Sequence, residues 1–495
     1  MDVSKDVSKL KREPFILKDR YLNIFLSIYI NSTIVIVFII LSDEFIHWFT
    51  IPVLMSGIII GMDAIDWIRK KVDLFDPVGF IGLFGFHFFF LAPLLQIYWD
   101  FGMTYVDPPD DWRNWLGGMA IINSLGLIIY RKTRKFIFNK LATKKIKSYW
   151  KINTLKMLRI SIPLLIIMFS TQVLIYARYG GIFGYITTFT EKTDDFEGQG
   201  FLFLISESFP IILLFLIALL LRKSKHKKNI LLIFSFLLIY FIIRIFFGGL
   251  RGSRSNILWA MIWAVGVIHL WLRPLSRKFI YFGIIILIVF ALGYDVYKKA
   301  GSDVLKAIQH KGSLLEVSEK SGRGIDTVLL DDLSRTNVQA YVLYKLVAYP
   351  DSYQLALGRS YLGDISILIP KKIWPDRIPT KVKEGTDIIK GQGSYDKYDY
   401  ISSRIYGLTG EFMLNFGYLF TPLTFIILGV YVALIRYLLY FLRPDDGRLL
   451  LYPFLVISCF LILVQDLDNF IFGLTKNFSL PFIIVFLSSV RETRE

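Results

Sequence analysis

Long apolar stretches alternate with short polar links along most of the chain. A membrane-spanning helix needs about 20 mainly apolar residues, because it must cross the hydrocarbon core of the bilayer. The pattern therefore predicts an all-α polytopic membrane protein with about twelve transmembrane helices. The expected spans are residues 21–41, 46–62, 78–98, 112–130, 157–177, 201–221, 230–247, 255–272, 279–296, 412–435, 449–464 and 470–490.

The charge of the links predicts the orientation of these spans. Every second link is rich in Lys and Arg, and the links between them are acidic or mixed. Short basic loops stay in the cytoplasm, so we expect both termini there. The first twenty residues are too polar for a signal peptide, and no cleavage site follows the first apolar run. The basic links are residues 69–71, 131–151, 222–228, 273–278 and 436–448.

One polar segment, residues 298–410, is long enough to fold outside the bilayer. The predicted topology places it on the outer face. We therefore expect three parts: residues 1–297 with nine spans, the extracytoplasmic segment 298–410, and residues 411–495 with three spans. Seven of the segment's cations are spaced among Tyr, Trp, Gly and Pro: Arg323, Arg335, Arg359, Lys371, Lys372, Arg377 and Arg404.

The composition is typical of a membrane protein and excludes several classes of function. The chain is 54% hydrophobic and 20% charged, with a net charge of +17. Most of that charge is in the basic links, so it does not indicate nucleic acid. The one cysteine, Cys459, excludes an intramolecular disulfide and a cysteine metal cluster. No P-loop, GxGxxG or HExxH is present, so we expect no metal or cofactor and an activated substrate or a gradient as the energy source.

The first candidate site is the turn FFGGLRGSRSN at residues 246–256. Two glycines precede Arg251 and Arg254, and guanidinium groups match phosphate oxygens with paired hydrogen bonds. Arg244 lies inside the preceding span, where an ionisable residue is costly and marks a functional candidate. The alternative is that Arg251 and Arg254 only reach to lipid headgroups.

The second candidate site is SSRIYGLTGEFMLNFGYLF at residues 402–420, where the polar segment re-enters the membrane. Arg404 and Glu411 would share one face of a continuous helix, although Gly407 and Gly410 put that continuity in question. A carboxyl group in apolar surroundings can have a raised pKa and act as a base. The alternative is a structural ion pair.

Four stretches carry a resemblance to a known family. The chain resembles bacterial oligosaccharide repeat-unit polymerases of the O-antigen (Wzy-type) class, and the stretches follow the family's order through much of the second half of the chain. They are YARYGGIFGYI (176–186), GGLRGSRSN (248–256), LGRSYLGDISILIPKKIWPDRIPTK (357–381) and GLTGEFMLNFGYLFTP (407–422).

The resemblance implies a fold similar to GT-C glycosyltransferases and an active site outside the bacterial cytoplasmic membrane. The substrates it implies are undecaprenyl-pyrophosphate-linked glycans, as donor and as acceptor, with no metal or nucleotide sugar. The growing chain is transferred from its lipid carrier to the non-reducing end of a new repeat unit. A polysaccharide chain-length regulator is a possible partner, and the polymer is lipopolysaccharide O-antigen, capsule or exopolysaccharide.

With this reaction in view, we assign provisional roles to individual residues. Glu411 is the first choice for the base that activates the acceptor hydroxyl, and Asp364 is the second. Arg254 and Arg404 would stabilise the leaving pyrophosphate. Related ligases use a loop histidine, but no motif match surrounds His310. The expected substrate-binding residues are Arg251, Arg244, Arg359, Tyr361, Tyr406 and Asn415.

Other functions stay open at this point. A ligase would transfer a finished chain to a lipid or protein acceptor. A flippase for the same lipid-linked glycans also suits twelve spans, but it should carry its cations in a central cavity and lack a large outer segment. A membrane scaffold without chemistry is the third alternative, and the arginine-containing turn argues against it.

Overall fold

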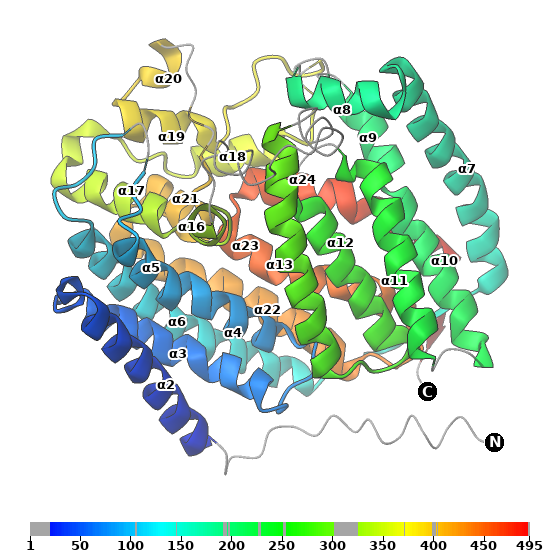
Figure 1. Ribbon diagram of the computed structural model, residues 1–495, viewed down its shortest axis with the longest axis horizontal. Coiled ribbons are helices and arrows are strands. Elements are labelled where there is room, and N and C mark those ends of the chain that lie inside the picture. The colour runs from blue at the N-terminus through cyan, green and yellow to red at the C-terminus, as the bar shows by residue number, and fades with distance from the viewer. Residues whose placement is uncertain are drawn as a thin grey trace, which may run out of the picture. The chain divides into compact units, whose positions relative to one another are not determined.

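The computed structural model describes residues 20–103, 106–144, 146–191, 196, 199–225, 229–250, 254–300, 325–370, 372–397, 402 and 404–493. These residues are mainly helical (Figure 1), and they form two compact units. Unit 1 comprises the described residues within 1–145, 326–440 and 458–473, and unit 2 comprises those within 146–325, 441–457 and 474–495.

Eight helices in the described part of the chain are long and apolar enough to cross a membrane. This confirms the prediction of a helical polytopic membrane protein. They are Tyr21–Leu41, Thr50–Ile68, Pro77–Tyr98, Thr154–Arg178, Gly200–Lys223, Ile230–Gly249, Arg254–Leu272 and Tyr418–Phe441.

The predicted count of twelve spans is not confirmed. The expected spans 112–130 and 279–296 lie within the helices α6 (Trp112–Ala142) and α13 (Arg277–Ala300). The last two expected spans are shorter or broken. Helix α23 (Tyr452–Val464) has 13 residues, about 20 Å at 1.5 Å per residue, which is less than the hydrocarbon core of about 30 Å. The pair Leu467–Asn477 and Ser479–Ser488 is bent by 43°, and counting it as one span gives nine.

The first part of unit 1 is a set of closely packed apolar helices. Helix α3 packs against α2, α4 and α6, and Figure 1 shows these helices running side by side. Small residues allow close approach in membrane helices: a Cβ on Gly82 would lie 2.4 Å from the backbone nitrogen of Ala64. The elements are α2 (Arg20–Leu41), η2 (Asp43–Phe45), α3 (Thr50–Ile68), α4 (Pro77–Phe86), η3 (His87–Leu91), α5 (Ala92–Tyr98) and α6 (Trp112–Ala142).

The described part of the polar segment from Asp326 onward is also mainly helical and belongs to unit 1. Helix α17 packs on α6 and on α21, and α19 packs on α18 and α21. Tyr341 of α17, Ile388 of α19 and Met413 of α21 enter the same hydrophobic core as the first helices of the unit. The elements are α16 (Ile325–Thr327), η8 (Val328–Asp332), α17 (Thr336–Ala348), η9 (Pro350–Ser352), α18 (Arg359–Ser366), α19 (Lys381–Lys390), α20 (Ser394–Lys397), α21 (Gly407–Phe416), η10 (Tyr418–Thr424) and α22 (Phe425–Phe441).

Unit 2 consists mainly of helices, with one short ribbon that the hydropathy pattern did not predict. Strands β1 (Ser148–Ile152) and β2 (Ser489–Thr493) pair antiparallel. Helix α7 contacts α8, α9, α10 and α25, and α12 contacts α10, α11 and α13. The helices are α7 (Thr154–Arg178), α8 (Gly181–Glu191), α9 (Gly200–Glu207), α10 (Phe209–Lys223), α11 (Ile230–Arg244), η6 (Ile245–Gly249), α12 (Arg254–Val267), η7 (Ile268–Leu272), α13, η11 (Gly447–Leu450) and α25 (Ser479–Ser488); the unit boundaries cut α23 and α24 (Leu467–Asn477).

Candidate functional site

Two carboxyl groups from different helices meet inside unit 1. Glu411 on α21 and Asp364 on α18 are 2% and 0% exposed, and their carboxyl groups are close enough to share a hydrogen bond when one of them is protonated. Glu411 Oε1 accepts a hydrogen bond of 3.0 Å from Ser360 Oγ, and Oε2 accepts one of 2.8 Å from the backbone N–H of Leu467. Asn415 Nδ2 donates to Ser360 Oγ at 2.8 Å. The carboxyl pair is therefore held from several directions.

The surroundings of the pair favour a shared proton. Burial raises the pKa of Glu411 well above its usual value, and the hydrogen bond to Asp364 raises it further. Burial also raises the pKa of Asp364, to about 6. Asp364 Oδ2 is buried and receives no hydrogen bond from an amide, hydroxyl or ammonium group of the described residues. A protonated Glu411 can donate to an ionised Asp364, so the two carboxyl groups can share one proton.

Asp466, between α23 and α24, fixes the start of helix α21. Its Oδ1 accepts hydrogen bonds from the backbone N–H groups of Tyr406, at 2.8 Å, and Gly407, at 2.7 Å. Its Oδ2 accepts from Lys381 Nζ, which also donates to Asp468 at 3.1 Å. Burial lowers the pKa of Lys381, but the two aspartates outweigh this effect and raise it above its usual value. Asp466 therefore supplies the acceptor for N–H groups that have no partner within the helix.

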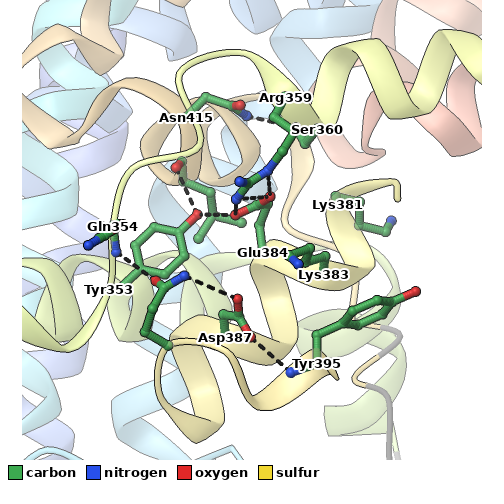
Figure 2. A network of polar contacts seen from close by, with 12 residues as sticks. Tyr353, Gln354, Arg359, Ser360, Lys381, Lys383, Glu384, Asp387, Tyr395 and Asn415 are labelled. Carbon is green, nitrogen blue, oxygen red and sulfur yellow. Dashed lines mark hydrogen bonds and ion pairs between the residues drawn. The ribbon is translucent and has the colours of Figure 1, made fainter. Parts of the chain in front are cut away.

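A second polar network links α18 to α19 (Figure 2). Arg359 Nε and Nη2 donate to the two carboxylate oxygens of Glu384, at 2.9 and 3.0 Å. Tyr353 donates to Glu384 Oε2 at 2.9 Å, and the Glu384 side chain is 1% exposed. The Arg359 side chain is 43% exposed, so its guanidinium group is both bound to a buried partner and accessible from outside. Planar two-point pairing of this kind fixes orientation as well as charge.

The structure places the other predicted residues of unit 1 as follows. Helix α21 begins at Gly407, so Arg404 precedes it and does not share a continuous helix with Glu411. Tyr361 is partly buried, with its ring 6.2 Å from that of Phe416. Tyr406 is 1% exposed and lies in the hydrophobic core, so its ring offers no face to a sugar. Asn415 is buried, and its Oδ1 accepts from the backbone N–H of residue 358 at 2.9 Å.

The predicted arginine turn belongs to unit 2. Arg244 is 5% exposed, and its Nη1 donates to the carbonyl oxygens of Glu207 at 2.7 Å and Phe247 at 3.1 Å. Arg254 is buried at the first position of α12. Arg251 lies outside the described residues, as does His310. In the same unit, Lys476 Nζ lies 2.6 Å from Glu207 Oε2.

Comparisons of the chain with models of protein families, with curated proteins and with solved structures found no match.

Several residues of the site were not selected from the sequence. Ser360 donates to Glu411, and the backbone N–H of Lys381 donates to Asp364. Glu384 pairs with Arg359, and Asp466 accepts from the start of α21. Asp466 could have been selected from the sequence, because it is an ionisable residue in the short link between the expected spans 449–464 and 470–490. The other three lie in a polar segment, where a further polar residue carries no information.

Proposed function

We propose that this protein is a membrane glycosyltransferase that polymerises oligosaccharide repeat units carried on undecaprenyl pyrophosphate. The observation that supports this most is the buried carboxyl pair of Glu411 and Asp364, which lies outside the membrane spans and carries raised pKa values. Raised carboxyl pKa values are a feature of catalytic acids and bases. The order of the sequence stretches that resemble O-antigen polymerases supports the same reaction.

In the proposed reaction, a hydroxyl group of the acceptor glycan attacks the anomeric carbon of the donor. The bond from the hydroxyl oxygen to that carbon forms as the bond from the carbon to the pyrophosphate oxygen breaks, with inversion. The lipid pyrophosphate leaves with the bonding electrons. The hydroxyl proton passes to the ionised member of the carboxyl pair, which is Asp364 while Glu411 keeps its proton. This reverses the order of preference between the two residues that the sequence suggested.

Two further requirements follow from this proposal. Both carboxyl groups are almost fully buried, so the acceptor can reach them only if α18 is displaced from α21 when substrate binds. The leaving pyrophosphate also needs fixed cations. We assign that role to two cations of unit 1: Arg359, whose side chain is accessible, and Arg404.

The test is a polymerisation assay with the purified full-length chain in lipid nanodiscs and a lipid-pyrophosphate-linked oligosaccharide from its host. We expect a ladder spaced by one repeat unit. Asp364→Asn and Glu411→Gln should lower the rate by about 10²–10⁴-fold, as the loss of a general base does. Asp396→Asn is the matched control, because its carboxylate lies in the same segment and its side chain is 64% exposed.

The outcomes separate the alternatives. A ladder of normal rate from both folded variants would overturn the assignment of the carboxyl pair. An intact substrate after incubation with folded wild-type protein would overturn the polymerase proposal. Transfer of a finished chain to another acceptor would then indicate a ligase, and movement of the intact substrate across the bilayer would indicate a flippase.

A further inference from the structure

Helix α18 is inverted relative to a surface helix of a water-soluble protein. Its buried positions are small or polar: Ser360, Gly363 and Asp364. Its outward positions include Leu362, 60% exposed, and Ile365, 52% exposed. In water the apolar face of such a helix turns toward the core, because burial of apolar area stabilises by about 25 cal/mol per Å². An outward apolar face therefore indicates an apolar surrounding.

The chain directly after α18 also exposes apolar side chains. Leu368 is 56% exposed, Ile373 75% and Trp374 38%. Lys372, between them, is exposed, and Arg377, just after them, is partly buried. Apolar side chains, a tryptophan and basic residues together are the composition of segments that lie at the boundary between lipid tails and headgroups.

This surface connects directly to a membrane span. The backbone N–H groups of Ala356 and Leu357 donate to the carbonyl oxygens of Leu414 and Asn415, both at 3.0 Å. Those acceptors belong to the last turns of α21, just before the candidate span Tyr418–Phe441 begins. At the start of that span Leu419 is 75% exposed, which is the exposure expected of a lipid-facing residue.

We propose that residues 359–370 and 372–374 lie in the membrane surface, with the outward face of α18 and the following turn in contact with the bilayer and Lys372 and Arg377 directed to anionic headgroups. In this arrangement the polar segment contacts the membrane through α18 and is not held away from it. The inner face of α18 carries Asp364, so this docking keeps the carboxyl pair at headgroup level. The proposal concerns the lipid surface and does not depend on glycosyl transfer.

The experiment is a depth measurement with nitroxide labels on single cysteines. Leu362→Cys and Leu368→Cys are labelled in the full chain, in nanodiscs that contain phosphatidylglycerol. The natural Cys459 is 0% exposed, and unmodified protein treated with the same reagent corrects for it. Leu419→Cys is the lipid-facing reference, and Asp351→Cys, at an exposed position of the same segment, is the aqueous reference.

We expect the labels at 362 and 368 to collide with oxygen more than with a water-soluble nickel chelate, as at 419, and the label at 351 to do the reverse. Nickel accessibility at 362 and 368 equal to that at 351 would overturn the proposal. Protection from both reagents would also overturn it, because it would show that protein covers this face.

A second measurement uses the native side chains. Lipids brominated near the headgroup should quench the fluorescence of wild-type protein more than that of Trp374→Phe. Equal quenching in the two proteins would count against the docking even if the cysteine variants failed to fold.

Discussion

The contact between Lys381 and Asp466 gives the sharpest stability prediction. Their side chains are 3% and 0% exposed, so solvent screens the pair little. In Asp466→Ala the backbone N–H groups of Tyr406 and Gly407 lose their acceptor, and Lys381 keeps only Asp468. A buried donor left without a partner costs about 1–3 kcal/mol, and breaking a buried ion pair costs about 3–5 kcal/mol. These costs are not additive, and we expect a loss of about 3–5 kcal/mol.

Two further variants separate the charge from the hydrogen bonds. Asp466→Asn keeps an oxygen for the two N–H groups and removes the charge, so it should lose less than Asp466→Ala. Adding Lys381→Met to Asp466→Asn removes the buried cation that is left with Asp468 alone, and it should restore part of the loss, because an apolar replacement of a buried pair is often tolerated. Asp468→Asn is the matched control. It is the same chemical change two residues away, at a side chain that is 15% exposed.

The assay is unfolding of the purified variants in mixed detergent micelles, followed by near-ultraviolet circular dichroism, with free energies compared at one detergent composition. The expected order of loss is Asp466→Ala, then Asp466→Asn, then Asp468→Asn. The reasoning is refuted if Asp466→Ala loses no more than Asp468→Asn. It is also refuted if the double variant is less stable than Asp466→Asn alone.

Three other predictions follow from the described contacts. The pKa of Asp364 is raised from 3.8 to about 6 in the folded state, so its ionisation lowers the stability of wild-type protein as pH rises through that range. Asp364→Asn should therefore gain stability relative to wild type between pH 4 and 7. A stability difference that is constant with pH would contradict this. Gly82→Ala should destabilise the protein by about 1–3 kcal/mol through overpacking. Gly283→Ala should not, because nothing lies within 4 Å of a Cβ added there. Equal thermal midpoints for the two variants would argue against close packing of α4 on α3. Arg359→Lys should lose about 1 kcal/mol, because an ammonium group cannot make the two-point contact with Glu384, and unchanged unfolding would show that this contact contributes little.

The sequence determined the membrane class, because the evidence for it is local. Each apolar stretch satisfies its own backbone hydrogen bonds as a helix, so length and composition decide whether it can cross a bilayer. Glu411 could be selected in the same way, since an ionisable residue before an apolar run stands out from its neighbours. The count of spans was less secure, because a short helix such as α23 and a bent pair such as α24 and α25 have the composition of a span without its geometry.

The partners of Glu411 were decided by the tertiary structure. Asp364, Ser360 and the N–H of Leu467 reach it from distant parts of the chain, and no sequence pattern joins them. The same holds for Asp466 at the start of α21. The periodicity of Leu362 and Ile365 shows that α18 is amphipathic, but not which face is buried. Packing decides this, because the small and polar side chains of α18 fit against α19 and α21 and leave the larger apolar ones outside.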